Sequence, residues 1–135
     1  MKRRKAREYV LQFLYAWEIN ENIEISEFWE RNGEKNNEIK SFANQIIEGT
    51  IENIHLIDEI IQKYATKWNI KRMITIDKNI LRFGVYEILF RPDIPYQVTI
   101  NEAVEIAKKY STRESAAFIN GILDRIAKEE KQLSY

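Results

Sequence analysis

The sequence predicts an all-α fold, a helical bundle, and three observations support this prediction. Only four glycines and two prolines interrupt its 135 residues. Strong helix formers fill the intervals between them, which favours long helices joined by short loops. Apolar residues recur at the i, i+3, i+4, i+7 spacing of amphipathic helices, whereas no alternating strand pattern of useful length occurs.

A first helix is expected from Arg3 to Asn20, because a single apolar stripe runs along it at helical spacing. The stripe consists of Ala6, Tyr9, Val10, Phe13, Leu14 and Trp17. Residues 21–38 are polar and contain Gly33, so we expect a loop there with one short turn around Phe28 and Trp29.

Two further apolar stripes predict two more helices. The first stripe contains Ile39, Phe42, Ala43, Ile46, Ile47, Thr50 and Ile54, and the second contains Ile57, Ile60, Ile61, Tyr64 and Trp68. We expect the helices to separate between Asn53 and Leu56, although no proline or glycine forces a break there. A short linker from about Thr66 to Arg72 follows.

The segment from Met73 to Phe90 is apolar on most sides, which is typical of a central, largely buried helix. Its polar residues form one narrow stripe that we expect to be exposed: Thr75, Lys78, Asn79, Arg82 and Tyr86. Pro92 disfavours helical geometry at the residue before it, so the helix should end near Phe90.

Two capping-box spacings predict the starts of the last two helices. Thr99 precedes Glu102 by three residues, and Ser111 precedes Glu114 by three. We therefore expect one helix from Thr99 to Tyr110 and a last helix from Thr112 to Lys131. The total is six helices in one domain, arranged as two three-helix subdomains of about residues 1–68 and 69–135.

The composition excludes several classes of function. Cysteine is absent and His55 is the only histidine, which excludes thiol chemistry, disulfides and multi-histidine metal sites. No apolar run approaches the roughly 20 residues of a membrane span, so we expect a cytoplasmic protein without membrane contact. The glycines form no phosphate-binding loop. No cofactor, metal or enzymatic activity is expected.

The most informative local feature is the basic start of the chain, because the formal net charge of the whole is zero. Five cations open the first helix and could contact phosphates; the alternative is a solvated helix tip. Arg4, Arg7, Leu11 and Tyr15 share one helical stripe, which suggests a basic track leading to an aromatic ring. Tyr15 at this spacing also fits half-buried packing.

Phe118 stands out in the last helix, because helical spacing turns it away from the expected core face together with Glu114. It could cover a neighbouring helix, or it could meet a nucleic-acid base or a partner chain. Single-stranded RNA stacks its bases on such rings.

Three stretches together resemble the NusB antitermination family. They are RRKAREYVLQFLYAWE (residues 3–18), IDKNILRFGVYEILFRPDIPY (residues 76–96), and INEAVEIAKKY followed by FINGILDRIAKE (residues 100–129). They occur in the family's order, whereas residues 21–70 match only in helical character.

The resemblance implies a bundle of two three-helix subdomains that binds the boxA element of single-stranded nascent RNA. It implies joint binding with NusE, a small-subunit ribosomal protein, within an RNA polymerase antitermination complex that supports complete transcription of ribosomal RNA operons. By matching positions, it implies RNA contacts at Lys2, Arg3, Arg4, Lys5, Arg7, Glu114 and Phe118. Tyr15, Asp77 and Arg82 match positions at the partner or RNA interface.

Two other readings stay open at this point. Some ribosomal-RNA cytosine methyltransferases carry a similar module before their catalytic domain, but this chain lacks the nucleophilic cysteine of such an enzyme. The chain could instead be a protein-interaction module, or a homodimer that covers its own basic face.

Overall fold

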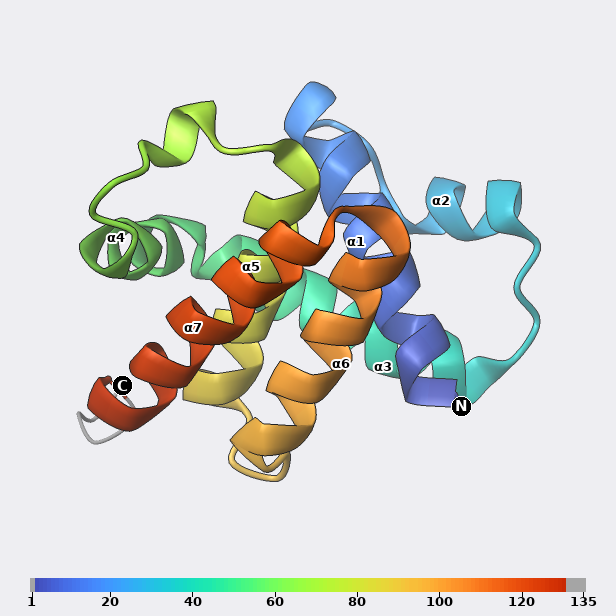
Figure 1. The fold of residues 1–135 in the computed structure, drawn as a ribbon. Coiled ribbons are helices and arrows are strands. Elements are labelled where there is room, and N and C mark those ends of the chain that lie inside the picture. Colours follow the sequence, from blue (N-terminus) through green and yellow to red (C-terminus); the bar gives the residue numbers. More distant parts are fainter. Residues whose placement is uncertain (1, 131–135) are drawn as a thin grey trace.

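The computed structural model describes residues 2–130, and every regular element within that range is helical (Figure 1). Seven α-helices and one 3₁₀ turn follow one another: α1 (Lys2–Ile19), α2 (Ile25–Asn32), α3 (Asn37–Glu52), α4 (Ile54–Tyr64), η1 (Ile70–Arg72), α5 (Thr75–Phe90), α6 (Tyr96–Tyr110) and α7 (Arg113–Glu129). The all-α prediction is confirmed, whereas the predicted total of six helices, three on each side of the linker, was wrong, because the described residues form four α-helices before the linker and three after it. None of the helices in the described range is long and apolar enough to cross a membrane.

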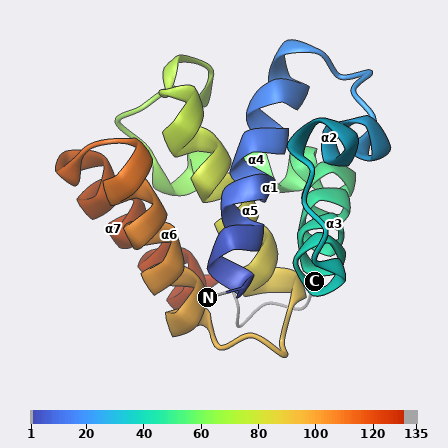
Figure 2. The ribbon, with the colours of Figure 1, turned by 90° about the vertical axis from the view of Figure 1, so that its right-hand side faces the viewer.

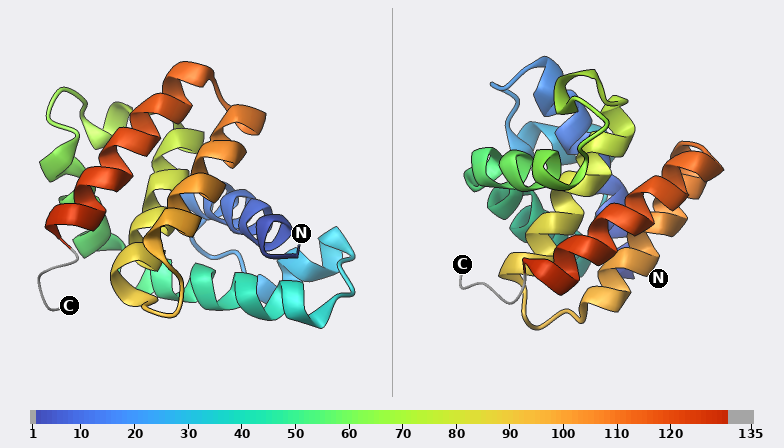
Figure 3. Two further views of the ribbon diagram at one scale, coloured as in Figure 1. Left: turned by 60° about the horizontal axis from the view of Figure 1, so that its bottom comes forward. Right: turned by 60° about the vertical axis from the view of Figure 1, so that its left-hand side comes forward.

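Helix α5 is the centre of the bundle. It packs against α1, α3 and α4 on one side and against α6 and α7 on the other (Figures 2 and 3). Ile80, Leu81, Phe83 and Val85 are fully buried, as the nearly all-round apolar sequence predicts. Helices α1, α3 and α4 thus lie on one side of α5, and helices α6 and α7 lie on the other.

Helix α1 follows the prediction closely, because its apolar stripe faces α3 and α5. Ala6, Val10, Phe13 and Leu14 are buried there. The break between α3 and α4 falls at Asn53, within the expected interval, and the Asn53 side chain donates a hydrogen bond to the Gly49 carbonyl. Gly49 also lets the ring of Tyr86 lie directly against the α3 backbone, where a larger side chain would collide with it.

The expectation of one short turn around Phe28 and Trp29 was wrong in extent, because these residues belong to the eight-residue helix α2. Phe28 is buried and meets Phe13 edge to face, with ring centroids 5.4 Å apart. The Trp29 indole N–H donates to Asn44 Oδ1 at 2.7 Å. Gly33 ends the helix at a φ of 68°, a left-handed conformation that favours glycine. Tertiary aromatic packing, rather than a long amphipathic repeat, stabilises α2.

The predicted start of α6 was wrong by three residues, whereas the predicted start of α7 was wrong by only one. Helix α6 begins at Tyr96 after Pro95, and Thr99 lies inside it, where its hydroxyl donates to Glu87 Oε1 at 2.8 Å. Helix α7 is capped by Thr112, whose Oγ1 accepts the Ser115 N–H at 3.0 Å. The expected end of α7 at Lys131 lies outside the described residues.

Candidate nucleic-acid interface

The five cations that open α1, here called the basic end (Lys2, Arg3, Arg4, Lys5 and Arg7), do not form a free positive surface. Four of them pair with carboxylates of other helices or loops. The pairs are Lys2–Glu38 at 3.2 Å, Arg4–Glu102 at 2.5 Å, Lys5–Glu34 at 2.9 Å and Arg7–Glu87 at 2.8 Å. Any phosphate that binds here must therefore compete with a carboxylate already in place.

Arg7 is enclosed within the protein. Its Nε and Nη2 donate to the two carboxylate oxygens of Glu87, each at 2.8 Å, and both side chains are almost completely buried. Such a bidentate pair, completed by the Thr99 hydroxyl, satisfies both charges inside a low-dielectric core. The expected basic track through Arg4, Arg7, Leu11 and Tyr15 was therefore wrong, since Arg7 and Leu11 are buried.

Arg4 and Lys5 lie nearer the solvent and keep their partners there. The hydrogen bond from Arg4 lowers the pKa of the Glu102 carboxyl. Glu34, in the loop between α2 and α3, accepts hydrogen bonds from the Asn36 backbone N–H, the Lys5 ammonium and the Tyr9 hydroxyl. These donors lower the pKa of Glu34 to about 2. The loop is thereby fixed to α1.

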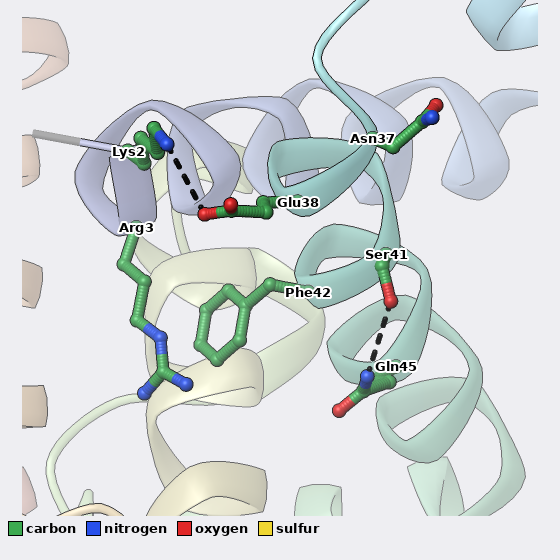
Figure 4. A pocket seen from close by; sticks show the side chains of 7 residues that line it. All are labelled: Lys2, Arg3, Asn37, Glu38, Ser41, Phe42 and Gln45. Carbon is green, nitrogen blue, oxygen red and sulfur yellow. Dashed lines mark hydrogen bonds and ion pairs between the residues drawn. The ribbon is translucent and has the colours of Figure 1, made fainter.

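Arg3 differs from its neighbours, because no carboxylate in residues 2–130 forms an ion pair with it. Its guanidinium carbon lies 4.4 Å from the centroid of the Phe42 ring of α3 (Figure 4). A cation over an aromatic face is attracted by the ring quadrupole. Arg3 is thus held against α3 while its side chain stays exposed.

A second candidate surface, here called the aromatic cleft, lies between the linker before α5 and the start of α7. It has a volume of about 290 Å³, and its lining includes Trp68, Ile74, Asp77, Glu114 and Phe118. The rings of Trp68 and Phe118 meet edge to face with centroids 5.9 Å apart. Trp68 remains 58% exposed, which leaves a large apolar surface open to a ligand.

Asp77 forms the polar wall of this cleft. It is buried, and its carboxylate oxygens accept the Ser111 hydroxyl at 2.7 Å and the Ser115 hydroxyl at 2.6 Å. Asp77 therefore joins the first turn of α5 to the first turn of α7. Glu114 and Phe118 follow on α7, the former exposed and the latter half-buried.

Arg82 was expected on an exposed stripe of α5, and that expectation was wrong. It is buried, and it donates to both oxygens of Asp58 at 2.8 Å and to Glu18 Oε1 at 2.6 Å. The two cations of the polar stripe, Lys78 and Arg82, both bind Glu18 of α1, and Arg82 also binds Asp58 of α4. The two carboxylate partners of Arg82 lie 24 and 64 residues away in sequence, so helical spacing alone could not identify them.

The candidate residues thus fall into separate places. Asp77, Glu114 and Phe118 meet in the aromatic cleft, whereas Lys2 and Arg3 line a different cleft beside α3. The start of α1 and the start of α7 lie apart in two views at right angles (Figures 1 and 2). Tyr15 is exposed on the second half of α1, as is Ile19.

The sequence interpretation missed Trp68 and Ile74 as surface residues. Trp68 continues the apolar repeat of α4, but the helix ends at Tyr64, so the ring lies in the linker and faces solvent. Ile74 precedes α5 as its N-cap and is equally exposed. Both residues lie at the ends of apolar segments next to the predicted linker, where helical spacing does not determine whether a side chain is buried.

The fold and these two surfaces define a small all-α bundle suited to contact a polyanion at one place and flat apolar groups at another. Its sequence matches the NusB family over residues 4–128. The chain belongs to the NusB family.

Individual relatives agree with this assignment. The transcription antitermination protein NusB of Thermodesulfovibrio yellowstonii is 77% identical over 142 residues, covering 96% of this chain and 94% of that protein. The T. maritima NusB structure is 42% identical with a TM-score of 0.85, covering 94% of this chain and 91% of that one. A crystal structure of the antitermination factors NusB and NusE in complex with dsRNA is also similar, with a TM-score of 0.85, 28% identity, and coverage of 94% and 96%.

Proposed function

We propose that this chain is a transcription antitermination factor that binds boxA-type RNA together with NusE and promotes complete transcription of ribosomal RNA operons. It acts in the cytoplasm as an adaptor within the RNA polymerase antitermination complex and catalyses no reaction itself. The relatives named above support the proposal, since they are antitermination proteins and one similar structure contains NusE and RNA.

The observation that carries the proposal is the pairing of a basic end with an open aromatic cleft on a protein of zero formal net charge. RNA offers phosphates to cations and unstacked bases to aromatic rings. Apart from the five cations of the basic end, the chain holds 16 Lys and Arg against 21 Asp and Glu, so electrostatic attraction to RNA is confined to the basic end.

Within this proposal the cations of α1 divide by exposure. Lys2, Arg3, Arg4 and Lys5 contact RNA phosphates from the surface. Arg7 acts from inside, because its pair with Glu87 holds α1 against α5 and, through Thr99, against α6. Arg7 thus positions the basic end.

At the aromatic cleft, Phe118 and Trp68 stack against an RNA base, and Glu114 lies at the rim beside them. Asp77 fixes the geometry of this surface by holding the start of α7 through Ser111 and Ser115.

The surface proposed for NusE lies on the second half of α1. Tyr15 and Ile19 are exposed there, and an aromatic ring beside an aliphatic side chain is a suitable protein contact. Arg82 of α5 supports this surface by binding Glu18, which lies on α1 next to Ile19.

A gel-shift assay with boxA RNA, this protein and NusE, separately and together, tests the proposal. We expect a complex with both proteins at concentrations where neither alone shifts the RNA, and no such complex with a scrambled RNA. Equal shifts with boxA and scrambled RNA, or no gain from NusE, would contradict it. Solution mass with and without RNA would also reveal a homodimer that excludes RNA.

A further inference from the structure

A second cleft lies beside the basic end, between the first turn of α1 and the first half of α3. Its volume is about 410 Å³, and it is lined by Lys2 and Arg3 of α1 and by Asn37, Glu38, Ser41, Phe42 and Gln45 of α3. We call it the α1–α3 cleft. Figure 4 shows Lys2 and Arg3 on one side of Phe42, and Ser41 and Gln45 on the other. None of its α3 residues belongs to the two surfaces described above.

Arg3 is prepared for an anion at the edge of this cleft. Its guanidinium lies over Phe42, which is itself buried, so the contact limits the motion of the side chain. The planar group can still present its N–H donors in a fork that matches two phosphate oxygens. Less conformational freedom is therefore lost when an anion binds.

The neighbouring charges leave Arg3 available. Arg7 and Arg91 also approach the Phe42 ring, with guanidinium carbons at 5.2 and 5.6 Å from its centroid. Arg7 pairs with Glu87, and Arg91 pairs with Asp93. The pKa of Asp93 is lowered first by its hydrogen bonds from Arg91 and to a lesser degree by the charge of Arg3. Arg91 occupies both Asp93 oxygens at 2.9 Å.

The only carboxylate among the lining residues is that of Glu38, which pairs with Lys2 at 3.2 Å. Both side chains of this pair are more than half exposed, so water and salt screen it and a phosphate can replace it at little cost. Two cations and one displaceable carboxylate give the cleft a preference for an anion.

The far wall provides neutral hydrogen-bonding groups. Gln45 Oε1 accepts a bond from Arg91 at 3.1 Å, which orients the amide and leaves its NH₂ group held only by a long 3.4 Å contact to Ser41 Oγ. The Gln45 amide and the Ser41 hydroxyl line the same cleft as the two cations. Such neutral groups can hydrogen-bond the sugar or the base edge of a nucleotide whose phosphate is bound by the cations.

We propose that the α1–α3 cleft binds one nucleotide of the RNA strand beyond the boxA element. Arg3 and Lys2 hold the phosphate that joins this nucleotide to the boxA element, and Ser41 and Gln45 contact its ribose or base. This inference rests on the proposed function, because it extends the same RNA from the basic end onto α3. Arg3 then acts as a planar, pre-oriented group and not as a diffuse charge.

Fluorescence anisotropy with two lengths of RNA tests this proposal. The short RNA is the boxA element alone. The two longer RNAs add four nucleotides to it, one at the 5′ end and the other at the 3′ end. We expect one extension to increase the affinity of the wild-type protein by about tenfold, the value of one charge-assisted hydrogen-bonded contact. Gln45→Glu, which keeps the acceptor for Arg91 but places a negative charge in the cleft, should remove that gain.

Two variants separate shape from charge. Arg3→Lys keeps the charge but loses the planar contact with Phe42, so it should also remove most of the gain. Gln97→Glu adds the same charge as Gln45→Glu on an exposed position of α6 and should leave the gain intact. An unchanged gain in Gln45→Glu, or equal losses in Gln45→Glu and Gln97→Glu, would overturn the proposal.

The outcomes distinguish this inference from the proposed function. Failure of the wild-type protein and NusE to bind the short boxA RNA would contradict the proposed function. Binding of the short RNA with no gain from either extension would contradict the α1–α3 cleft alone. As a direct readout, the NMR signals of the Gln45 side-chain NH₂ and the Ser41 amide should shift with the extended RNA and not with the short one.

Discussion

The basic end and the aromatic cleft differ in how far the protein already satisfies its own side chains. At the basic end, four of five cations have a carboxylate partner within 3.2 Å. In the aromatic cleft, Trp68 and Phe118 contact each other but leave apolar surface uncovered. A phosphate at the basic end replaces an existing partner, whereas a base in the cleft buries surface that had none. The cleft should therefore provide more of the net affinity, and the basic end more of the salt dependence.

Within the basic end, the burial of each ion pair distinguishes cations that stabilise the fold from cations that can bind RNA. Arg7 and Glu87 lie in the core, while Lys2 and Glu38 are largely exposed. Buried pairs are costly to break, whereas exposed pairs contribute little to stability. The depth of each pair thus predicts whether its loss affects folding or RNA binding.

The largest expected effect is on stability. Glu87→Gln leaves the buried Arg7 charge with only the more distant Glu102 carboxylate, 3.9 Å away, so the free energy of unfolding should fall by about 3 to 5 kcal/mol. Urea denaturation measures this loss. Glu38→Gln is the matched exposed control and should change stability by less than about 1 kcal/mol. Similar losses in the two variants would show that burial does not divide the basic end in this way.

The next effect is on RNA affinity at the aromatic cleft. Phe118→Ala should weaken boxA binding by about 1 to 3 kcal/mol, because it removes a ring on which a base stacks. Phe118→Tyr keeps the ring and should bind nearly as well as the wild type. Calorimetric titration provides the affinities, and thermal unfolding provides the control. A lower melting temperature with unchanged affinity would assign Phe118 to packing.

A smaller effect is expected where an internal carboxylate competes with RNA. Glu102→Gln removes the charge that holds Arg4, so boxA affinity should rise by roughly 0.5 to 1 kcal/mol, the value of a solvent-accessible ion pair. Glu105 lies on the same helix but pairs with Lys108, so the control substitution Glu105→Gln should have a weaker effect on boxA affinity. Lower affinity in Glu102→Gln would mean that the carboxylate orients Arg4 for RNA and does not compete with it.

The smallest effect concerns the loop before α3 at acid pH. The hydrogen bonds from Asn36, Lys5 and Tyr9 lower the pKa of Glu34 from 4.5 to about 2 in the folded protein. Its contribution to stability is therefore complete above about pH 4.5 and is lost as the pH falls towards 2. Glu34→Gln should flatten the dependence of melting temperature on pH in this window. An unchanged pH profile would contradict the assignment.

Periodicity predicted the parts of the fold that depend on one helix at a time. The buried stripe of α1 and the central position of α5 follow directly from apolar spacing. Helix α2 was underestimated because its eight residues are too few for a repeat and are stabilised by contacts of Phe28 and Trp29 with α1 and α3. The start of α6 was misplaced because Thr99 has capping-box spacing but binds Glu87 instead.

Side-chain exposure was the harder problem at the candidate site. Arg7 and Arg82 look like surface residues in sequence, since isolated arginines are rarely buried. Their partners, Glu87 and Glu18, lie 80 and 64 residues away, so only the packing of α1 against α5 reveals them. The aromatic cleft depends in the same way on where α4 ends, which places Trp68 beside Phe118.

The dependence of boxA affinity on salt concentration tests the division between the two regions most directly. If three or four cations of the basic end contact phosphates, the slope of log K against log salt should be about −2 to −3. Lys5→Gln should make the slope shallower by about 0.7, whereas Phe118→Ala should lower the affinity at every salt concentration without changing the slope. A wild-type slope near zero, or an equal change of slope in both variants, would contradict the account.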